Sequence, residues 1–422
     1  MFGEAITVVT GLVLAYALVA HRLTAANISA PMLSLLAGAA VFAGTALDVD
    51  TELVHVTAEV TLVMILFHDA STVMLTRLRH DAGLSLRLLL IGFPLAIVAT
   101  FLVTHALFPA LGIAGAWLLA AAITPTDAGL GAPTVLNPVV PMRVRRGLNV
   151  ESGLNDGLAT PIVLLALSAL ASGAGEQTPG VLQVGLIPVA LAVALAVAVG
   201  LAAAWSMDRS RARHLSGRRG RQVATFAIPL LLFGLADQVG ANAFIAAFVG
   251  GVVFGAASIT LDDEHETSDL LEVSADLLSF VVWFLAGGIL LLVLDAGFRW
   301  QWAILAVLAL TVLRILPVAL SLIGTGLRVP TVLFIGWFGP RGLATIVFGL
   351  LAVEELGSGS ALMTDVGGVI GITVVLSAFA HGISAGPLSG RYGRWAERTD
   401  PVAEGSSSVE PRRTRGTMHH HR

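Results

Sequence analysis

Long apolar runs are the feature of this sequence that most limits what the chain can fold into. A helix needs about 20 apolar residues to cross the hydrocarbon core of a bilayer, and many runs here approach that length between short polar breaks. Hydrophobic residues make up 56% of the 422 residues and charged residues only 12%, whereas soluble domains carry about 25% charged residues. The sequence therefore predicts an all-α integral membrane protein with the lipid bilayer as a partner.

The polar breaks divide the chain into about thirteen predicted transmembrane helices. The predicted spans are residues 4–20, 27–47, 53–76, 84–108, 112–131, 147–172, 180–206, 222–239, 241–258, 270–294, 301–323, 330–353 and 365–386. The first run lacks the basic start of a signal peptide, and no small-residue cleavage site stands out after it, so we expect a retained helix. Residues 1–390 are expected to form the membrane domain, and residues 391–422 a disordered tail.

Arginine residues predict the orientation of the chain, because short basic loops stay in the cytoplasm. The basic residues follow odd-numbered predicted helices: Arg22, Arg77, Arg79, Arg87, Arg143, Arg145, Arg146, Arg209, Arg211, Arg213, Arg218, Arg219, Arg221, Arg391, Arg394 and Arg398. The loops after even-numbered helices carry mostly acids. The N-terminus is therefore expected outside the cell and the C-terminus in the cytoplasm.

The predicted helix 147–172 carries the densest set of polar residues at membrane depth. Glu151, Ser152, Asn155 and Asp156 lie within two turns, and Ser152 shares a helix face with Asp156. A charged residue inside hydrocarbon costs about 2.5–3.5 kcal/mol on insertion scales, so those that remain are functional candidates. Asp156 is the central candidate for an ion-binding residue.

Two predicted helices are interrupted by proline in corresponding places of the two halves. Pro125 precedes Thr126 and Asp127, and Pro340 precedes Arg341. Proline removes a backbone donor and frees carbonyl groups, which are tolerated at membrane depth where they line protein or a water-filled site. Paired interruptions of this kind point to the binding site of a transporter built from inverted repeats.

Two further helices carry ionisable residues. Arg314 lies in the middle of the predicted helix 301–323 and needs a buried carboxylate, for which Glu151 is the candidate. His68 and Asp69 lie toward the end of the predicted helix 53–76. Asp69 is a candidate for the site or for its entrance.

These residues together resemble the NhaP-type sodium/proton antiporters of the monovalent cation:proton antiporter-1 family. The matching segments are Thr126-Asp127, the run from Glu151 to Gly157, the run from Phe67 to Ala70, Arg314, and the run from Gly339 to Gly342. The resemblance implies an NhaA-like fold with two crossing broken helices. It implies a mobile six-helix core at about 84–172 and 301–386, a dimerisation scaffold from the remainder, and a homodimer in the bacterial inner membrane.

The resemblance also implies roles for individual residues. Asp156 would carry either the cation or the proton, and Ser152 and Thr126 would join it as ligands of the monovalent cation. Further residues of the predicted ion- and proton-binding set are Asp127, Asn155 and Asp69. Glu151 with Arg314 would form a structural charge pair that also holds Asn155, while Pro125, Pro340 and Arg341 would support the breaks. Sodium, or lithium or potassium, and protons would be the transported partners, with no cofactor and no nucleic acid.

The residue before Asp156 predicts the charge carried per cycle. Asn155 cannot take a proton, so one proton exchanged for one sodium ion would be electroneutral, and the membrane potential would not drive the cycle. A potassium/proton exchanger on the same fold is the main alternative. An intramembrane aspartyl protease using Asp127 and Asp156 is a remote one, because nothing here resembles the motifs of that enzyme class. The predicted protein is thus a secondary transporter, not an enzyme.

Overall fold

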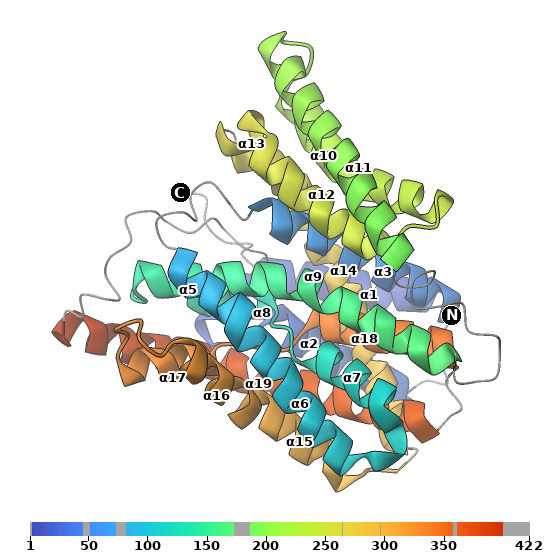
Figure 1. Cartoon of the computed structure of the whole chain (residues 1–422), viewed down its shortest axis with the longest axis vertical. Coiled ribbons are helices and arrows are strands. Elements are labelled where there is room, and N and C mark those ends of the chain that lie inside the picture. The colour runs from blue at the N-terminus through green and yellow to red at the C-terminus, as the bar shows by residue number, and fades with distance from the viewer. Residues whose placement is uncertain are drawn as a thin grey trace.

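The computed structural model describes residues 2–44, 51–72, 82–172, 186–263, 265–295, 297–357 and 361–399, and all regular structure within these ranges is helical (Figure 1). Seven helical segments in these ranges are long and apolar enough to cross a membrane, and shorter apolar helices accompany them. This confirms an all-α membrane architecture.

The first group of helices comes from the N-terminus and the middle of the chain. Its members are α1 Phe2–Ala25, α2 Ala30–Gly44, α3 Thr51–Thr72, α10 Ile187–Ala212, α11 Arg218–Gln238, α12 Ala243–Ala257, α13 Ile259–Asp263, η4 His265–Ser268 and α14 Asp269–Asp295. Helix α14 packs against α2 and α3, and α12 packs against α3 and α10. The hairpin of α10 and α11 projects from the top of the molecule in Figure 1.

The second group consists of two triplets of helices. The first triplet contains α5 Ala82–Arg87, η1 Leu88–Gly92, α6 Phe93–Leu107, η2 Pro109–Leu111, α7 Gly112–Ile123, α8 Ala128–Val135 and α9 Met142–Ser172. The second contains α15 Trp300–Leu310, α16 Val312–Ser321, α17 Val329–Trp337, α18 Leu343–Leu356 and α19 Ala361–Thr399. Each triplet is interrupted in its middle member, between α7 and α8 and between α17 and α18. The two predicted helix breaks are therefore confirmed.

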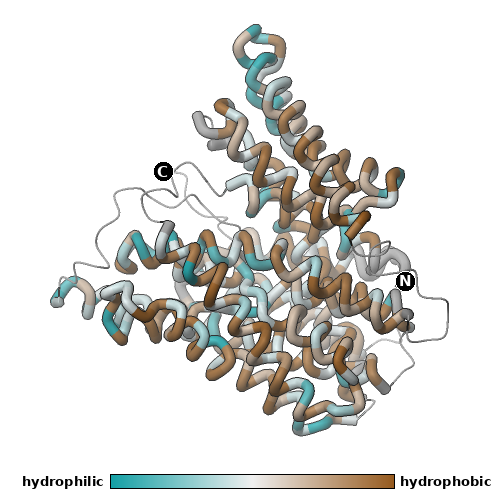
Figure 2. Tube along the Cα trace, viewed as in Figure 1, coloured by the Kyte–Doolittle hydropathy of each residue, from teal (hydrophilic) through white to brown (hydrophobic). Residues whose placement is uncertain are grey.

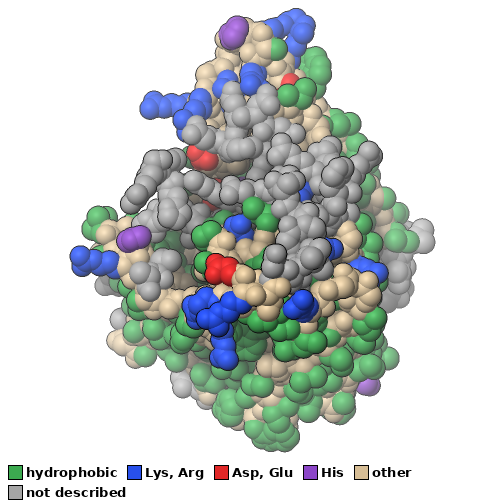
Figure 3. All heavy atoms as spheres, turned by 90° about the vertical axis from the view of Figure 1, so that its left-hand side faces the viewer, with side chains coloured by type: hydrophobic (Ala, Val, Ile, Leu, Met, Phe, Trp, Pro, Cys, Tyr) green, Lys and Arg blue, Asp and Glu red, His purple; other side chains and the backbone are tan. Residues whose placement is uncertain are grey.

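Hydrophobic residues predominate along most of the helices (Figure 2). Leu90, Leu102 and Trp205 are 66%, 60% and 69% exposed, which fits a surface that faces lipid rather than water. Basic side chains instead gather over the end of the molecule that Figure 3 turns toward the viewer. This is the end where α9 begins and α19 finishes (Figure 1).

The last helix corrects the predicted start of the tail. Helix α19 continues to Thr399, past the predicted end of the span at 386 and the predicted tail boundary at 391. The reason is an aromatic contact, because the ring of Tyr392 stacks on Phe334 of α17 at 4.2 Å and its hydroxyl donates to Thr331 Oγ1 at 3.0 Å. Residues 400–422 lie outside the described part of the chain.

Helices α2 and α14 cross at a contact built on glycine. A Cβ atom on Gly38 would lie 1.8 Å from the carbonyl oxygen of Phe284, and one on Gly287 would lie 2.1 Å from that of Leu35. Small residues let helix backbones approach closely in membranes, where van der Waals packing drives association. These glycines therefore fix how the two helices pack.

We expect Gly38→Ala to destabilise the protein by about 1–3 kcal/mol, the usual cost of forcing extra atoms into a packed contact. Gly44→Ala is the matched control, because it lies at the exposed end of the same helix with nothing within 4 Å of the added Cβ. Thermal unfolding in detergent measures both. Equal melting temperatures for the two variants would contradict the glycine contact.

Candidate ion-binding site

The two helix breaks are joined to each other through Asp127. The Asp127 N–H donates to the Pro340 carbonyl at 2.7 Å, and the Leu343 N–H donates to Asp127 Oδ2 at 2.7 Å. Asp127 Oδ1 accepts from the Leu130 N–H at 2.9 Å. One carboxylate thus caps the N-termini of both α8 and α18, where the helix dipoles favour a negative charge. This geometry favours stabilisation of the breaks by Asp127 over the ion binding predicted for it from the sequence.

Glycine allows the breaks to come this close. A Cβ atom on Gly342 would lie 2.1 Å from Asp127 Oδ2, and one on Gly339 would lie 2.6 Å from Arg314 Nε and 3.0 Å from Thr126 Cγ2. Gly342 thus provides the space that the Asp127 carboxylate occupies.

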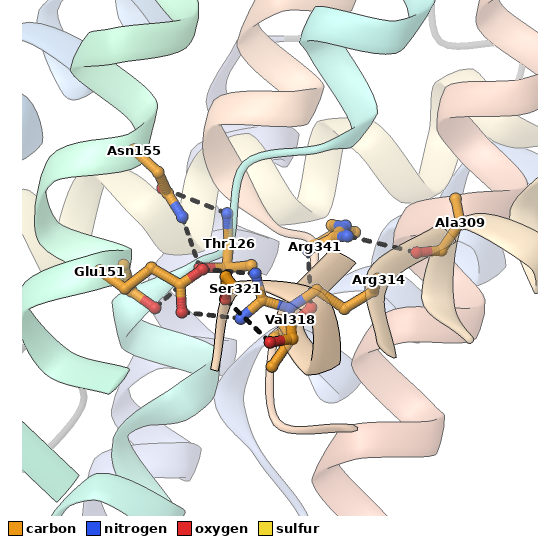
Figure 4. Close-up of polar contacts among 10 residues, drawn as sticks. Thr126, Glu151, Asn155, Ala309, Arg314, Val318, Ser321 and Arg341 are labelled. Carbon is orange, nitrogen blue, oxygen red and sulfur yellow. Dashed lines mark hydrogen bonds and ion pairs between the residues drawn. The ribbon is translucent and has the colours of Figure 1, made fainter. Parts of the chain in front are cut away.

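The first break is held by the polar face of α9. Asn155 Oδ1 accepts from the Thr126 N–H at 3.2 Å, and Asn155 Nδ2 donates to Thr126 Oγ1 at 2.7 Å (Figure 4). Thr126 Oγ1 also shares a hydrogen bond of 2.8 Å with Ser152 Oγ. Asn155 is therefore held by Thr126, which corrects the prediction that the charge pair of Glu151 and Arg314 holds it. Its amide replaces a helical partner that the break removes.

Glu151 and Arg314 form a buried ion pair between α9 and α16. The guanidinium contacts both carboxylate oxygens, with Nη2 of Arg314 2.7 Å from Oε2 and Nη1 bonded to Oε1 (Figure 4). Glu151 is 0% and Arg314 1% exposed. Two-point contact between a guanidinium and a carboxylate is the strongest form of such a pair. The pair predicted from the sequence thus connects the two triplets.

Arg341 is anchored by backbone carbonyls at the second break. Nη1 of Arg341 donates to the Gly339 oxygen at 2.9 Å, and Nη2 donates to the Ala309 oxygen at 3.2 Å. The Ala309 carbonyl is available because the chain bends at Thr311, which has φ −120° and ψ −95° between α15 and α16. Arg341 also lies within electrostatic reach of Asp156. Its positive charge therefore acts on that aspartate.

Asp156 lies on α9 one turn beyond Ser152 and is 5% exposed. Its backbone oxygen accepts from the Thr160 hydroxyl at 2.8 Å, and Gly157 next to it packs under the ring of Phe248. Asp69 is also 5% exposed and belongs to α3, which packs against α9. The structure therefore brings Thr126, Ser152 and Asn155 into direct contact and places Asp156 on the same helix face as Ser152.

A small cavity reaches the crossing from the boundary between the two groups of helices. Its volume is about 70 Å³, and it is lined by Tyr16, Ser34 and Asp276 of the first group and by Asp127 and Leu343 of the second. Because it touches both groups, the crossing borders a space that a relative movement of the groups would reshape.

Sequence reasoning missed several residues that hold the second break and its helices. Ser377 and His381 of α19 contact the break directly. Asp365 accepts from Arg299 Nη1 at 2.8 Å and from Trp302 Nε1 at 2.7 Å, which ties α19 to α15. In the sequence, Ser377 and His381 stand out only as two polar residues four apart in an apolar helix. This spacing predicts that they share a helix face, but it does not identify the groups that they contact.

The crossed breaks between two triplets define the class of this protein as a secondary transporter with discontinuous helices. A family model described as sodium/hydrogen exchanger, transmembrane, matches residues 8–390, and the chain belongs to that family. Because this is a family of transporters, the alternative of an aspartyl protease is wrong.

Individual relatives cover part of the chain. A Na⁺/H⁺ antiporter of Schizosaccharomyces pombe is 27% identical over 266 residues, which cover 59% of this chain and 56% of that protein. Na⁺/H⁺ antiporter 2 of Zygosaccharomyces rouxii is 26% identical over 268 residues, which cover 60% of this chain and 33% of that protein. The chain thus spans between a third and a little over half of the length of these relatives.

A solved structure shares the fold. The structure of the sodium proton antiporter MjNhaP1 from Methanocaldococcus jannaschii at pH 8 superposes with a TM-score of 0.75 at 20% identity, covering 93% of this chain and 99% of that one. An electron-microscopy structure of the same protein gives a TM-score of 0.67 at 19% identity, covering 93% and 98%. These matches confirm the predicted antiporter fold.

We expect Gly342→Ala to destabilise the crossing by about 1–3 kcal/mol, because the added methyl group displaces the Asp127 carboxylate. Gly131→Ala is the matched control on α8, since its Cβ would meet Pro340 Cγ at an ordinary 4.0 Å. Thermal unfolding of the two variants in detergent measures the difference. A Gly342→Ala protein as stable as Gly131→Ala would contradict the proposed role of the glycine.

The buried pair predicts strong coupling between its two members. Glu151→Leu or Arg314→Met alone should cost about 3–5 kcal/mol, because each leaves a buried charge unpaired. The double variant should lose much less stability than the sum of the two single losses, since it leaves no unpaired charge. Thermal unfolding of the four proteins in the cycle gives the coupling, and additive losses would show that the pair is not a unit.

Proposed function

We propose that this chain exchanges sodium ions for protons across the membrane by alternating access, with Asp156 binding one or the other. The observation that carries the proposal is a buried carboxylate beside two joined helix breaks. Asp156 is 5% exposed, and an ionised carboxylate is costly to bury unless another charge compensates it. Each occupant neutralises the carboxylate, so the occupied state can move where the bare anion cannot.

Candidate oxygen ligands for a small cation come from α9 and from the first break. Ser152, one turn before Asp156 on α9, has its hydroxyl oxygen 2.8 Å from that of Thr126. The adjacent break interrupts the helix at residues 124–127. Carbonyl groups of unwound segments near helix breaks coordinate sodium in transporters of this design. We assign Asp156, Ser152 and Thr126 as the ion ligands, with Asp69 on the access route.

The bonding of Glu151, Arg314 and Asn155 supports an electroneutral cycle. Glu151 and Arg314 neutralise each other within one ion pair. Asn155 uses its amide on Thr126 and has no proton to gain. In this proposal Asp156 alone changes occupancy, so one proton leaves for each sodium ion that binds and no net charge crosses the membrane.

The division into two groups of helices supports the predicted domain roles. We propose that the two triplets move as the core, and that the first group forms the scaffold of a homodimer. The cavity at their boundary provides room for such a movement. The arginine-rich end (Figure 3) would face the cytoplasm and leave the N-terminus outside. Location in a bacterial inner membrane stays a prediction.

Potassium or lithium is the alternative cation. The same hydroxyl and carboxylate oxygens would bind either ion, because selectivity among these ions depends on the size of the site and on where its carbonyls lie. Comparing the three cations side by side in the assay below separates the alternatives, and a stronger response to potassium than to sodium would favour the potassium exchanger.

In proteoliposomes with a pH-sensitive dye, a sodium gradient should drive proton movement, and Asp156→Asn should abolish it. Asp237→Asn is the control, because it removes a carboxylate at the exposed end of α11 and should leave transport intact. A potassium gradient with valinomycin should change the rate little, since about 2.3 kcal/mol per charge per 100 mV acts only on net charge. Transport retained by a folded Asp156→Asn protein would refute the assignment.

A further inference from the structure

Among the backbone groups that the second break separates are the Trp337 carbonyl and the Arg341 N–H, which a continuous helix would join. In an α-helix each carbonyl accepts from the N–H four residues further on, so the Trp337 carbonyl would accept from the Arg341 N–H. Helix α17 ends at Trp337 and α18 begins at Leu343, which pulls these groups apart. Unpaired backbone groups cost several kcal/mol each inside a membrane, and Arg341 is 1% exposed.

Helix α19 supplies a partner for each of the two groups. The Arg341 N–H donates to Ser377 Oγ at 2.5 Å, and His381 Nε2 lies 2.9 Å from the Trp337 oxygen. Ser377 and His381 are four residues apart, so they lie one above the other on one face of α19. Their spacing matches the spacing of the groups they serve.

The hydrogen bonds have a consistent direction when the His381 ring is neutral. A carbonyl can only accept, so Nε2 carries the proton and donates to Trp337. Ser377 Oγ accepts from Arg341, and with this tautomer its hydroxyl can donate to Nδ1 of His381, 3.4 Å away. A chain of donors would then run from Arg341 through Ser377 and His381 to the Trp337 carbonyl. Nδ1 also lies 3.0 Å from the Ser377 backbone oxygen, to which a doubly protonated ring would donate.

Further contacts fix the end of α17 against α19. The indole ring of Trp337 stacks on the His381 ring with 5.0 Å between centroids, and its Nε1 donates to Ser384 Oγ at 3.0 Å. The Trp337 carbonyl also accepts from the Gly339 N–H at 2.8 Å. The ring and the backbone of Trp337 are thus both held by α19.

We propose that Ser377 and His381 form a splint that holds the second break open at a fixed geometry and so positions the cation site. The position of the break reaches the site through two contacts. The Pro340 oxygen accepts from the Asp127 N–H at 2.7 Å, and Gly339 packs against Thr126 and Arg314. Both residues are positioning residues, since neither is among the proposed ion ligands. This inference rests on the proposed function, because its effect on transport is an effect on cation binding.

The splint should set the apparent affinity for the cation more than the maximal rate. His381→Phe keeps a ring that can stack on Trp337 but removes both nitrogens, and we expect the half-saturating sodium concentration in proteoliposomes to rise about tenfold, the effect of one lost buried hydrogen bond. His381→Gln keeps a donor and an acceptor on one side chain and should stay within about threefold of the unmodified protein. Equal shifts for Phe and Gln would overturn the splint.

Ser377 provides an independent comparison. Ser377→Ala removes the hydroxyl and should raise the half-saturating concentration, whereas Ser377→Thr keeps it and should not. If the two residues act as one chain, Ser377→Ala adds little to His381→Phe, because interacting residues are not additive. Additive effects would overturn the chain of hydrogen bonds. The two Ser377 variants also test the splint if His381→Phe does not fold.

Hydrogen exchange separates failure of the splint from failure of the proposed function. The backbone amides of Phe338, Gly339, Arg341 and Gly342 should exchange faster in His381→Phe and Ser377→Ala than in the Gln and Thr variants, whatever ion the protein carries. If exchange follows this pattern but sodium moves no protons, the proposed function is wrong and the splint stands. If exchange is unchanged in all four variants, the splint is wrong whatever the transport assay shows.

Discussion

The capping of two helix N-termini by Asp127 is the interaction on which the rest of the site depends. Two interrupted helices in a membrane expose backbone groups that lipid cannot satisfy. Asp127 accepts from Leu130 and Leu343, and its own N–H serves Pro340. Each break therefore provides hydrogen-bond partners for backbone groups of the other at the point where they cross. Gly342 is part of the same arrangement, since a side chain there would occupy the space of the carboxylate.

This arrangement also decides where charge is balanced. Asp127 is balanced by helix dipoles, Glu151 by Arg314, and Arg341 is held by the carbonyls of Gly339 and Ala309. In the proposed cycle, the transported ion would balance the charge of Asp156.

The parts of the fold that follow from general physical rules could be predicted from the sequence. Apolar length predicted an all-helical membrane protein, proline predicted both breaks, and the cost of a buried charge paired Arg314 with Glu151. The bend at Thr311 has neither proline nor glycine to signal it, and the Arg341 bond to Ala309 depends on it. The partners of Asn155 and His381 could not be predicted for another reason. They include backbone groups that become available only once the breaks exist.

The two breaks are held in different ways, and this difference bears on how the site could work. The first break is bonded to Asn155 and Ser152 on α9, the helix that carries Asp156, so a change of occupant there acts directly on Thr126. The second is bonded to α19 through Ser377 and His381, outside the proposed ligands. The first break can thus respond to the ion, while the second, joined to it through Asp127, is held in place. The site could then adjust locally while the crossing stays intact. The core could then move as one body with either occupant bound.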